Sequence, residues 1–474
     1  MSLKDYEIVI GLEVHVELKT DTKIFCSCPT AFGAPPNTQC CPVCAGLPGA
    51  MPTLNRRAVE LAVIAALALD ATVSSICRMD RKNYFYPDLP KAYQISQADS
   101  PIAKNGKLLF YVGDEERTVR IERLHIEEDA GKLTHVDGYT HVDLNRCGVP
   151  LIEIVSAPEI HSAEEASAYL RALRDILVAC GVSDCKMQEG SLRADVNLSL
   201  RKKGERTFGV RTEIKNINSF SFVEKAIRYE AQRQANELDR GGQIRRETRR
   251  FDPLSGETKL MRVKETEADY RFFPEPDLPP FVLDEGEIDR LQRRIPELPM
   301  AKAERFVTQY GLTKQDAAVL CSDFALSAFF EEAAAITPYD KLLSNLIQTD
   351  LLRLKGEGDS FVSPVSAKRL AELCTLVGER RINNSTAKKL LIRLSKSDFD
   401  LIRVVRDEHL EQISDPEQLR VLVVETIKAQ PKAVSDYQNG KRAALRALEG
   451  MAMAKVGGRA DPVLLEQLFL EALS

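Results

Sequence analysis

The stretch that most constrains the fold is Gly11–Leu18, which reads GLEVHVEL and alternates without interruption. Its even positions are apolar and would share one side of an extended strand. Its odd positions carry the ionisable side chains of Glu13, His15 and Glu17. A strand of this kind needs a sheet with one covered face, which is typical of antiparallel sheets.

The first 293 residues mix strands and a few helices, joined by loops rich in Pro, Gly, Asn and Asp. Because the strands come in runs and do not alternate strictly with helices, the pattern favours an α+β fold with a largely antiparallel sheet. We expect strands at Ile8–Leu18, Lys107–Val112, Val119–Glu127, Pro150–Val155, Val196–Leu200 and Phe208–Lys215. We expect helices at Arg56–Leu69, Ala163–Ala179 and Val223–Leu238.

The pattern changes after the proline-rich run at residues 274–280, which we interpret as an extended connector. From Glu287 onward it is helical almost to the end, and the last seventy residues or so resemble a separate small helical module. The expected organisation is therefore a sheet domain at 1–293, an all-α domain at 294–405 and a helical tail domain at 406–474.

Composition excludes several classes of function. The net charge of −5 rules out global basicity, so any nucleic-acid contact needs a local basic patch. The longest apolar run, Leu61–Leu69, is too short to cross a membrane, and the charged N-terminal stretch does not read as a signal peptide. We therefore expect a cytoplasmic protein. No Gly-x-x-x-x-Gly-Lys-Ser/Thr motif occurs, so any bound ATP would have to be held without a P-loop.

Five cysteines crowd between Cys26 and Cys44. Cys26-x-Cys28 and Cys41-x-x-Cys44 are separated by twelve residues, a spacing that suits tetrahedral coordination of a structural zinc ion. Cys40 makes the choice of the third ligand ambiguous, although the turn-forming Pro42 and Gly46 favour Cys41. Buried or redox-active thiols and an iron–sulfur cluster remain as alternatives.

Carboxylates recur among apolar neighbours at two further places. Glu153 lies in PLIEIVS, and Glu128 would share a face with apolar residues if its strand runs that far. A carboxylate in such a position costs several kcal/mol unless it is paired or coordinated. We therefore predict a divalent-cation site formed by Glu13, His15, Glu128 and Glu153, because oxygen ligands with one imidazole suit magnesium or manganese better than zinc. The alternative is a solvated outer face of the sheet.

Two other stretches carry polar groups that could join this site. In RKNYFYPDLPKAYQISQ, basic residues interleave with tyrosines, which suits phosphate contacts and base stacking. In QEGSLRADVNLSLR, charged and polar residues are spaced by two along an extended run. The residues expected to line a pocket are Lys82, Tyr84, Tyr86, Lys91, Tyr93, Glu189, Arg193 and Asp195. Ordinary exposed loop and strand surface is the alternative.

Several long motifs occur in an order that resembles one family closely. They include IGLEVHVEL, CPVCAGLPG, DRKNYFYPDLPKAYQISQ, HIEEDAGK, DLNRCGVPLIEIVS and EGSLRADVN. Together they resemble the B subunit of the tRNA-dependent amidotransferase GatCAB. The resemblance covers essentially the whole chain, and it is densest in the first 280 residues or so.

The resemblance implies an activity. In that family the complex amidates misacylated Glu-tRNA(Gln) or Asp-tRNA(Asn), and the B subunit uses ATP and Mg²⁺ to phosphorylate the tRNA-bound carboxylate. Ammonia comes from the amidase, the A subunit, which together with the small C subunit makes the complex a heterotrimer. The catalytic magnesium-site residues would be Glu13, His15, Glu128 and Glu153, with Glu127 as a substitute or helper for Glu128. The zinc ligands would be Cys26, Cys28, Cys41 and Cys44.

The C-terminal part resembles the family's tRNA-binding tail. Its stretch NGKRAALRALEGMAMAKVGGRADP is locally basic, which makes contacts to RNA phosphates plausible. The residues expected to contact the tRNA body are Lys441, Arg442, Arg446 and Lys455, and a solvated helix face is the alternative. Two other functions stay open, a non-catalytic zinc-containing tRNA-binding module and a free-standing carboxylate kinase.

Overall fold

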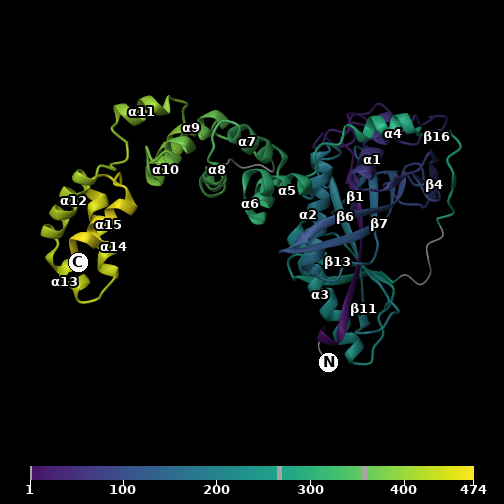
Figure 1. The fold of residues 1–474 in the computed structure, drawn as a ribbon. Helices are drawn as coiled ribbons and strands as arrows, with labels where there is room; N and C mark the ends of the chain where they lie inside the picture. The colour runs from purple at the N-terminus through teal and green to yellow at the C-terminus, as the bar shows by residue number, and fades with distance from the viewer. Residues whose placement is uncertain (1–2, 264–269, 355–360, 474) are drawn as a thin grey trace. The chain divides into compact units, whose positions relative to one another are not determined.

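The computed structural model describes residues 3–263, 270–354 and 361–473. The chain forms two compact units, residues 1–298 and residues 299–474 (Figure 1). The first unit contains the strands of the described chain, and the second is helical. The α+β organisation expected from the sequence is therefore confirmed.

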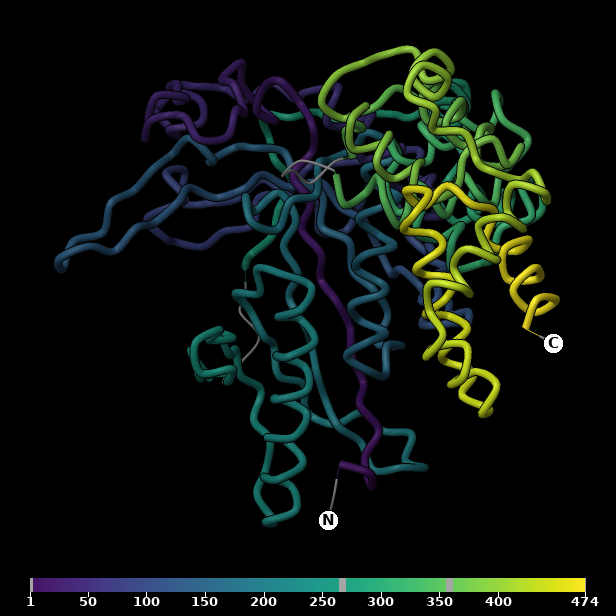
Figure 2. The backbone as a smooth tube through the Cα atoms, turned by 90° about the vertical axis from the view of Figure 1, so that its left-hand side faces the viewer, coloured from purple at the N-terminus to yellow at the C-terminus, as the bar shows by residue number. Residues whose placement is uncertain are grey.

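A nine-stranded sheet organises the first unit, in the order β14-β13-β12-β11-β1-β10-β7-β6-β2. All its neighbouring strands are antiparallel except β12 and β13. Its strands are β1 (Tyr6–Glu17), β2 (Thr72–Val73), β6 (Ala103–Val112), β7 (Glu115–Glu128), β10 (Pro150–Ser156), β11 (Leu192–Lys202), β12 (Thr212–Lys215), β13 (Glu247–Asp252) and β14 (Glu257–Val263). Strand β1 is central, and its purple tube runs through the first unit in Figure 2.

Three long helices pack against this sheet, α1 (Arg56–Ala68), α2 (Ala163–Ala179) and α3 (Phe220–Asp239). They cover the apolar side, where Leu12, Val14 and Val16 of β1 are 0% exposed. Helix α1 begins after Asn55, whose side-chain oxygen accepts from the Arg57 N–H at 2.9 Å, as an N-cap should. The opposite side of the sheet carries the ionisable residues.

The proline-rich run is not a connector between the units. It forms β15 (Phe273–Pro274) and leads into β16 (Phe281–Val282), which pair with β4 (Asp80–Asn83) and β3 (Ile76–Cys77). The following helix α4 (Glu285–Gln292) packs on α1, and its Leu291 is buried in the core of the first unit. Proline can be part of β15 because an edge strand does not need every backbone N–H as a hydrogen-bond donor. The first unit therefore ends at Leu298.

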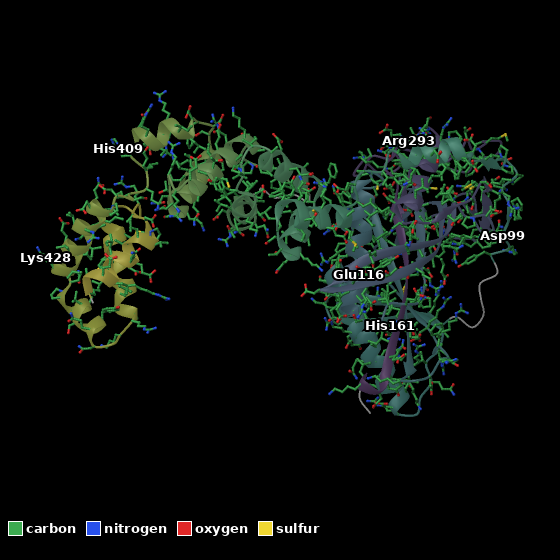
Figure 3. The ribbon with its side chains drawn as sticks, viewed as in Figure 1. Asp99, Glu116, His161, Arg293, His409 and Lys428 are labelled. Atoms are coloured by element: carbon green, nitrogen blue, oxygen red, sulfur yellow. The ribbon has the colours of Figure 1, made fainter. Side chains whose placement is uncertain are left out.

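Two further strand pairs complete the first unit. Strand β5 (Tyr93–Ser96) pairs with β4, and β8 (Lys132–Val136) forms a hairpin with β9 (Tyr139–Asp143). The described residues start with a 3₁₀ turn, η1 (Leu3–Asp5). His161 precedes α2, and its Nδ1 lies 2.9 Å from the Ile8 carbonyl oxygen (Figure 3).

The second unit consists of helices. They are α5 (Pro299–Tyr310), α6 (Lys314–Cys321), α7 (Phe324–Ala334), α8 (Asp340–Leu346), η2 (Ile347–Leu351), η3 (Leu352–Leu354), α9 (Ala367–Gly378), α10 (Asn384–Leu394), α11 (Leu401–Asp407), α12 (Pro416–Ala429), α13 (Pro431–Gln438), α14 (Ala443–Lys455) and α15 (Pro462–Leu473). Their buried side chains form one cluster from Phe306 to Val405 and another from Leu419 to Phe469. The boundary expected at 405/406 stays a prediction. None of the described helices is both long and apolar enough to cross a membrane.

Candidate functional site

The polar face of the sheet gathers charged groups around the middle of β1. Glu13 lies opposite Asp195 of β11, and His15 lies opposite Arg193 of β11 and Glu153 of β10. Since side chains of paired residues point to the same face, these groups are neighbours in space. The alternation of GLEVHVEL therefore places its ionisable residues on a face that adjacent strands also supply with charge.

One cluster on this face combines an imidazole with two carboxylates. The Nε2 atom of His15 lies 3.2 Å from Glu153 Oε2 and 3.7 Å from Glu127 Oε1. One ligand atom from each of these three residues lies within 4.8 Å of the others. His125 of β7 also belongs here, because its Nε2 lies 3.4 Å from Glu153 Oε2.

The two carboxylates of this cluster are buried and yet remain ionised. Burial acts to raise the pKa of Glu153, but His125 and His15 bring it well below its ordinary value. Burial likewise opposes ionisation of Glu127, and the hydrogen bond from His125 lowers its pKa. The cluster thus keeps negative charge in a poorly solvated place, where a cation would compete with the protons on the imidazoles.

A second group on the same face consists of Glu13, Asp195 and Glu213, with ligand oxygens within 4.8 Å of one another. Asn197 donates a hydrogen bond to Glu13 at 2.9 Å, and Lys215 pairs with Asp195 and Glu213. Burial and the neighbouring carboxylates raise the pKa of Glu13. The face therefore carries more negative charge than Lys215 balances. Glu213 and Lys215 were not singled out from the sequence.

Glu128, expected among the magnesium ligands, does not join either group. Along β7, His125 and Glu127 point to the polar face, whereas Glu128 points to the opposite face with Leu124 and Ile126. Its carboxylate accepts from Lys91 Nζ at 2.7 Å and from the Ile95 N–H at 2.9 Å. The structure thus brings Glu127, and not Glu128, to His15 and Glu153.

The expected pocket residues on β4, β5 and the loop between them divide into two sets. Lys82 Nζ lies 5.9 Å from the ring centroid of Tyr84 and 5.1 Å from that of Tyr270, which the sequence did not single out. The charge of Lys82 also contributes to lowering the pKa of Glu127, so this side chain borders the first cluster. Tyr86, in the loop between the two strands, is 58% exposed.

Lys91 and Tyr93 form the second set, on the side of Glu128. Lys91 Nζ lies 5.7 Å from the Tyr93 ring centroid, and the guanidinium of Arg81 lies 4.2 Å from the same ring. Two cations thus lie within cation–π distance of the Tyr93 ring.

The three residues expected from QEGSLRADVN behave differently. Asp195 belongs to the second acidic group, and Arg193 donates to Asp129 Oδ2 at 2.6 Å on the same face. Glu189 lies in the turn before β11 and pairs with Lys186 at 2.9 Å. Asp129 and His125 are additions that sequence reasoning missed, although the alternation of HIEED would have indicated His125 together with Glu127.

The cysteine cluster has the geometry of a tetrathiolate site. One Sγ atom from each of Cys26, Cys28, Cys41 and Cys44 lies within 4.8 Å of the others. The Cys41 and Cys44 sulfurs are 3.9 Å apart, close to the separation of about 3.8 Å that Zn–S bonds of about 2.3 Å give in a tetrahedron. Cys40 lies outside this set, with its Sγ 3.9 Å from Asn145 Oδ1.

The basic residues of the tail are exposed in the second unit. Lys441 and Arg442 directly precede α14, and Arg446 and Lys455 lie on that helix. Lys441 Nζ lies 2.9 Å from Asp436 Oδ1, so part of its charge is already matched. His409 and Lys428, labelled in Figure 3, lie after α11 and within α12 of the same unit.

Comparison with known proteins gives concordant results over both units. The family model described as the GatB/GatE catalytic domain matches residues 8–289, and the model described as the GatB domain matches residues 328–473. The B subunit of the aspartyl/glutamyl-tRNA(Asn/Gln) amidotransferase of Caldicellulosiruptor saccharolyticus is 48% identical over 477 residues, 99% of each chain. The protein of the same description from Carboxydothermus hydrogenoformans is 48% identical over 479 residues, 100% of each chain.

Proposed function

This chain belongs to the GatB family of tRNA-dependent amidotransferase subunits, and we propose on that premise that it activates the side-chain carboxylate of a misacylated tRNA. The substrate would be Glu-tRNA(Gln), Asp-tRNA(Asn) or both. The amidating enzyme is a glutamine-dependent ligase, and the chain would work in it beside an amidase, the A subunit of the complex, together with the small C subunit. We place this reaction in the cytoplasm, since a thiolate cluster requires reduced cysteines.

The reaction needs an activated acyl group. A carboxylate oxygen of the tRNA-bound residue attacks the γ-phosphorus of ATP, ADP leaves, and an acyl phosphate forms. Ammonia then attacks the acyl carbon, and phosphate leaves as the amide forms. Phosphorylation is required because oxide is a very poor leaving group, whereas phosphate is a good one.

The observation that carries this proposal is the cluster of His15, Glu127 and Glu153. Three neighbouring strands bring its ligand atoms within 4.8 Å, and burial of the carboxylates is unfavourable unless a cation or a proton donor matches them. Bound Mg²⁺ would neutralise charge on the transferred phosphoryl group. We assign Glu13, Asp195 and Glu213 to the same acidic face, and Glu128 to the support of Lys91.

The cationic and aromatic side chains around the acidic face are suited to bind the phosphates and the aminoacylated end of the tRNA. Lys82 and Arg193 border the acidic face, where they would contact phosphate groups or the carboxylate that is activated. Tyr84 and Tyr270 flank Lys82 and could stack on the terminal adenosine of a tRNA. We infer that Glu189 and the exposed Tyr86 lie at the margin of this pocket, whereas Lys91 and Tyr93 lie on the side of Glu128.

We further propose that Cys26, Cys28, Cys41 and Cys44 hold a structural zinc ion. The donor set fits, because four thiolates at this spacing complete a tetrahedron and leave no open position for substrate. Such a site would stabilise the loop after β1 without taking part in the chemistry.

The decisive experiment uses the full chain purified with candidate A and C subunits. Phosphate release from ATP and formation of amidated aminoacyl-tRNA are followed for the parent, for Glu153→Gln and for Glu122→Gln, an exposed carboxylate on β7. We expect Glu153→Gln to lower both rates at least about 100-fold, because several kcal/mol of charge stabilisation is lost. Glu122→Gln should match the parent, and tRNA affinity should be unchanged in both.

The other outcomes point to different functions. Full activity of Glu153→Gln would move the phosphoryl chemistry away from this face. A parent complex that binds tRNA but never consumes ATP would favour a non-catalytic tRNA-binding module. Turnover by the chain without its partners would favour a free-standing carboxylate kinase.

A further inference from the structure

Lys23 is a fully buried lysine beside the cysteine cluster, with 0% of its surface exposed. Its Nζ donates to the Leu144 carbonyl oxygen at 3.1 Å. Among the described residues, no carboxylate oxygen lies within 4.0 Å of that ammonium group. A buried ammonium is unfavourable unless a negative charge compensates it, so Lys23 needs a negatively charged partner other than a carboxylate.

Two other lysines of the described chain with little exposure have a carboxylate partner. Lys302 is 8% exposed and its Nζ lies 3.1 Å from Glu331 Oε2. Lys91 lies 2.7 Å from Glu128 Oε2. Lys91 and Glu128 line the same cavity as Lys23. Because Glu128 already forms an ion pair with Lys91, it does not compensate the charge of Lys23.

The cysteine cluster lies beside Lys23 in the fold. Lys23 lines a cavity of about 120 Å³ together with Cys26 and Cys44. A Cβ placed on Gly148 would lie 3.5 Å from Lys23 Cδ and 3.8 Å from Cys44 Cβ, so both side chains flank the same backbone atom.

The backbone fixes this arrangement. The Lys23 N–H donates to the Cys28 carbonyl oxygen at 2.9 Å, and the Ile24 N–H donates to the Gly148 carbonyl oxygen at 2.8 Å. Lys23 is thus tied to the first cysteine pair on one side and to the loop around Gly148 on the other. Its backbone is therefore fixed beside the cluster.

We propose that Lys23 is the counter-cation of the cysteine cluster, its buried ammonium balancing the charge that the thiolates carry when they hold a metal ion. This inference rests on the metal-holding role proposed above. Four thiolates and one divalent cation leave a net charge of −2, which is unfavourable in a buried place. Lys23 supplies one positive charge, and the Cys41 N–H contributes a hydrogen bond to Cys44 Sγ at 3.1 Å. Lys23 is a positioning residue and not a metal ligand.

The test compares the parent chain, Lys23→Met and Lys19→Met, an exposed lysine of the same segment. Zinc content and zinc affinity are measured on the full-length protein by competition with a chromogenic chelator. Thermal unfolding is recorded with zinc and after its removal. We expect Lys23→Met to weaken zinc binding roughly 10- to 100-fold, as loss of groups supporting metal ligands does, and Lys19→Met to change nothing.

The metal-free protein gives a second expectation. Without metal the cluster carries fewer thiolates than it does around a zinc ion, so Lys23 has less negative charge to balance. Relative to the parent, Lys23→Met should therefore lose less stability in the metal-free form than in the zinc form.

Each other result overturns the proposal. Equal zinc affinity of Lys23→Met and the parent would overturn it while leaving the zinc site in place. A parent that binds no zinc would remove both. A variant that is destabilised equally with and without zinc, or that folds in neither form, would assign Lys23 to packing alone.

Discussion

At Glu153, burial and charge act against each other, and the neighbours decide the outcome. The carboxylate is 9% exposed, and burial alone would keep it protonated. His15 and His125 reverse this, because both imidazoles bring their Nε2 atoms within 3.5 Å of its Oε2 atom. Glu153 therefore stays ionised although it is buried, and its carboxylate can bind a cation.

The adjacent residues Glu127 and Glu128 offer a sharp test at this scale. We expect Glu127→Gln to raise the Mg²⁺ concentration needed for half-maximal ATP hydrolysis about tenfold or more. Glu128→Gln should leave that requirement unchanged but lower the free energy of unfolding by about 3–5 kcal/mol, because Lys91 loses its partner.

Two measurements separate these effects. Titration of Mg²⁺ against ATP hydrolysis in the complex reports on the cluster, and urea unfolding of the chain reports on stability. A shifted Mg²⁺ requirement in Glu128→Gln together with a normal one in Glu127→Gln would restore the ligand set expected from the sequence.

At the scale of elements, a buried ionic network joins helix α3 to the edge of the large sheet. Glu230 of α3 is 0% exposed and accepts from Arg233 at 2.7 and 2.9 Å. It also accepts from Thr258 Oγ1 of β14 at 2.7 Å. Burial opposes its ionisation, but the bonds from Arg233 lower its pKa below the ordinary value. The network fixes α3 over strands that extend the sheet beyond β11.

The lowered pKa of Glu230 predicts how stability depends on pH. Because the folded pKa lies below the unfolded value of about 4.3, the stabilisation is fully present above that value. It is lost as the pH falls through the folded pKa. We expect Glu230→Gln to lower the free energy of unfolding by about 3 kcal/mol at pH 7, with a smaller difference below about pH 4.

Urea unfolding at both pH values measures this difference. Glu224→Gln, a partly exposed carboxylate of α3 that lies 3.8 Å from Arg228, is the matched control and should change stability by less than about 0.5 kcal/mol. If Glu230→Gln lowers the free energy of unfolding by the same amount at pH 7 and below about pH 4, Glu230 is not ionised in the folded protein.

At the scale of the whole molecule, we propose that the chemistry takes place on one unit and that the other unit contacts the tRNA body. The acidic face and the cysteine cluster belong to residues 1–298, whereas the exposed basic residues before and along α14 belong to residues 299–474. Such a division lets tRNA affinity change without any change in the reacting groups.

For the basic residues of the tail we expect an effect on tRNA binding alone. Lys441→Ala combined with Arg442→Ala should weaken tRNA binding and lower the slope of log K against log salt by about 1 for each lost phosphate contact. Binding is measured over a range of salt concentrations. The control, Lys428→Ala combined with Lys432→Ala, removes the same charge from α12 and α13 of the tail and should have a smaller effect. Equal losses in both double variants would attribute binding to overall charge.

Sequence alone determined the features that depend on local periodicity and spacing. The alternation of GLEVHVEL identified β1 and its polar face, since strand side chains alternate wherever the strand lies. The spacing of the cysteines identified a site for four sulfurs, because ligands in one short loop can converge without distant help. The helical structure of the second half of the chain was likewise predicted from its sequence pattern.

Only the tertiary structure decided which distant residues meet. A one-residue change of phase moves a side chain to the other face of a sheet, so the choice between Glu127 and Glu128 depended on where β7 begins its pairing with β10. The neighbours Asp195 and Glu213, the pairing of the proline-rich run with β4 and the burial of Lys23 depend on strands far apart in the chain. Local sequence sets the period of each element, but register and packing between elements set the site.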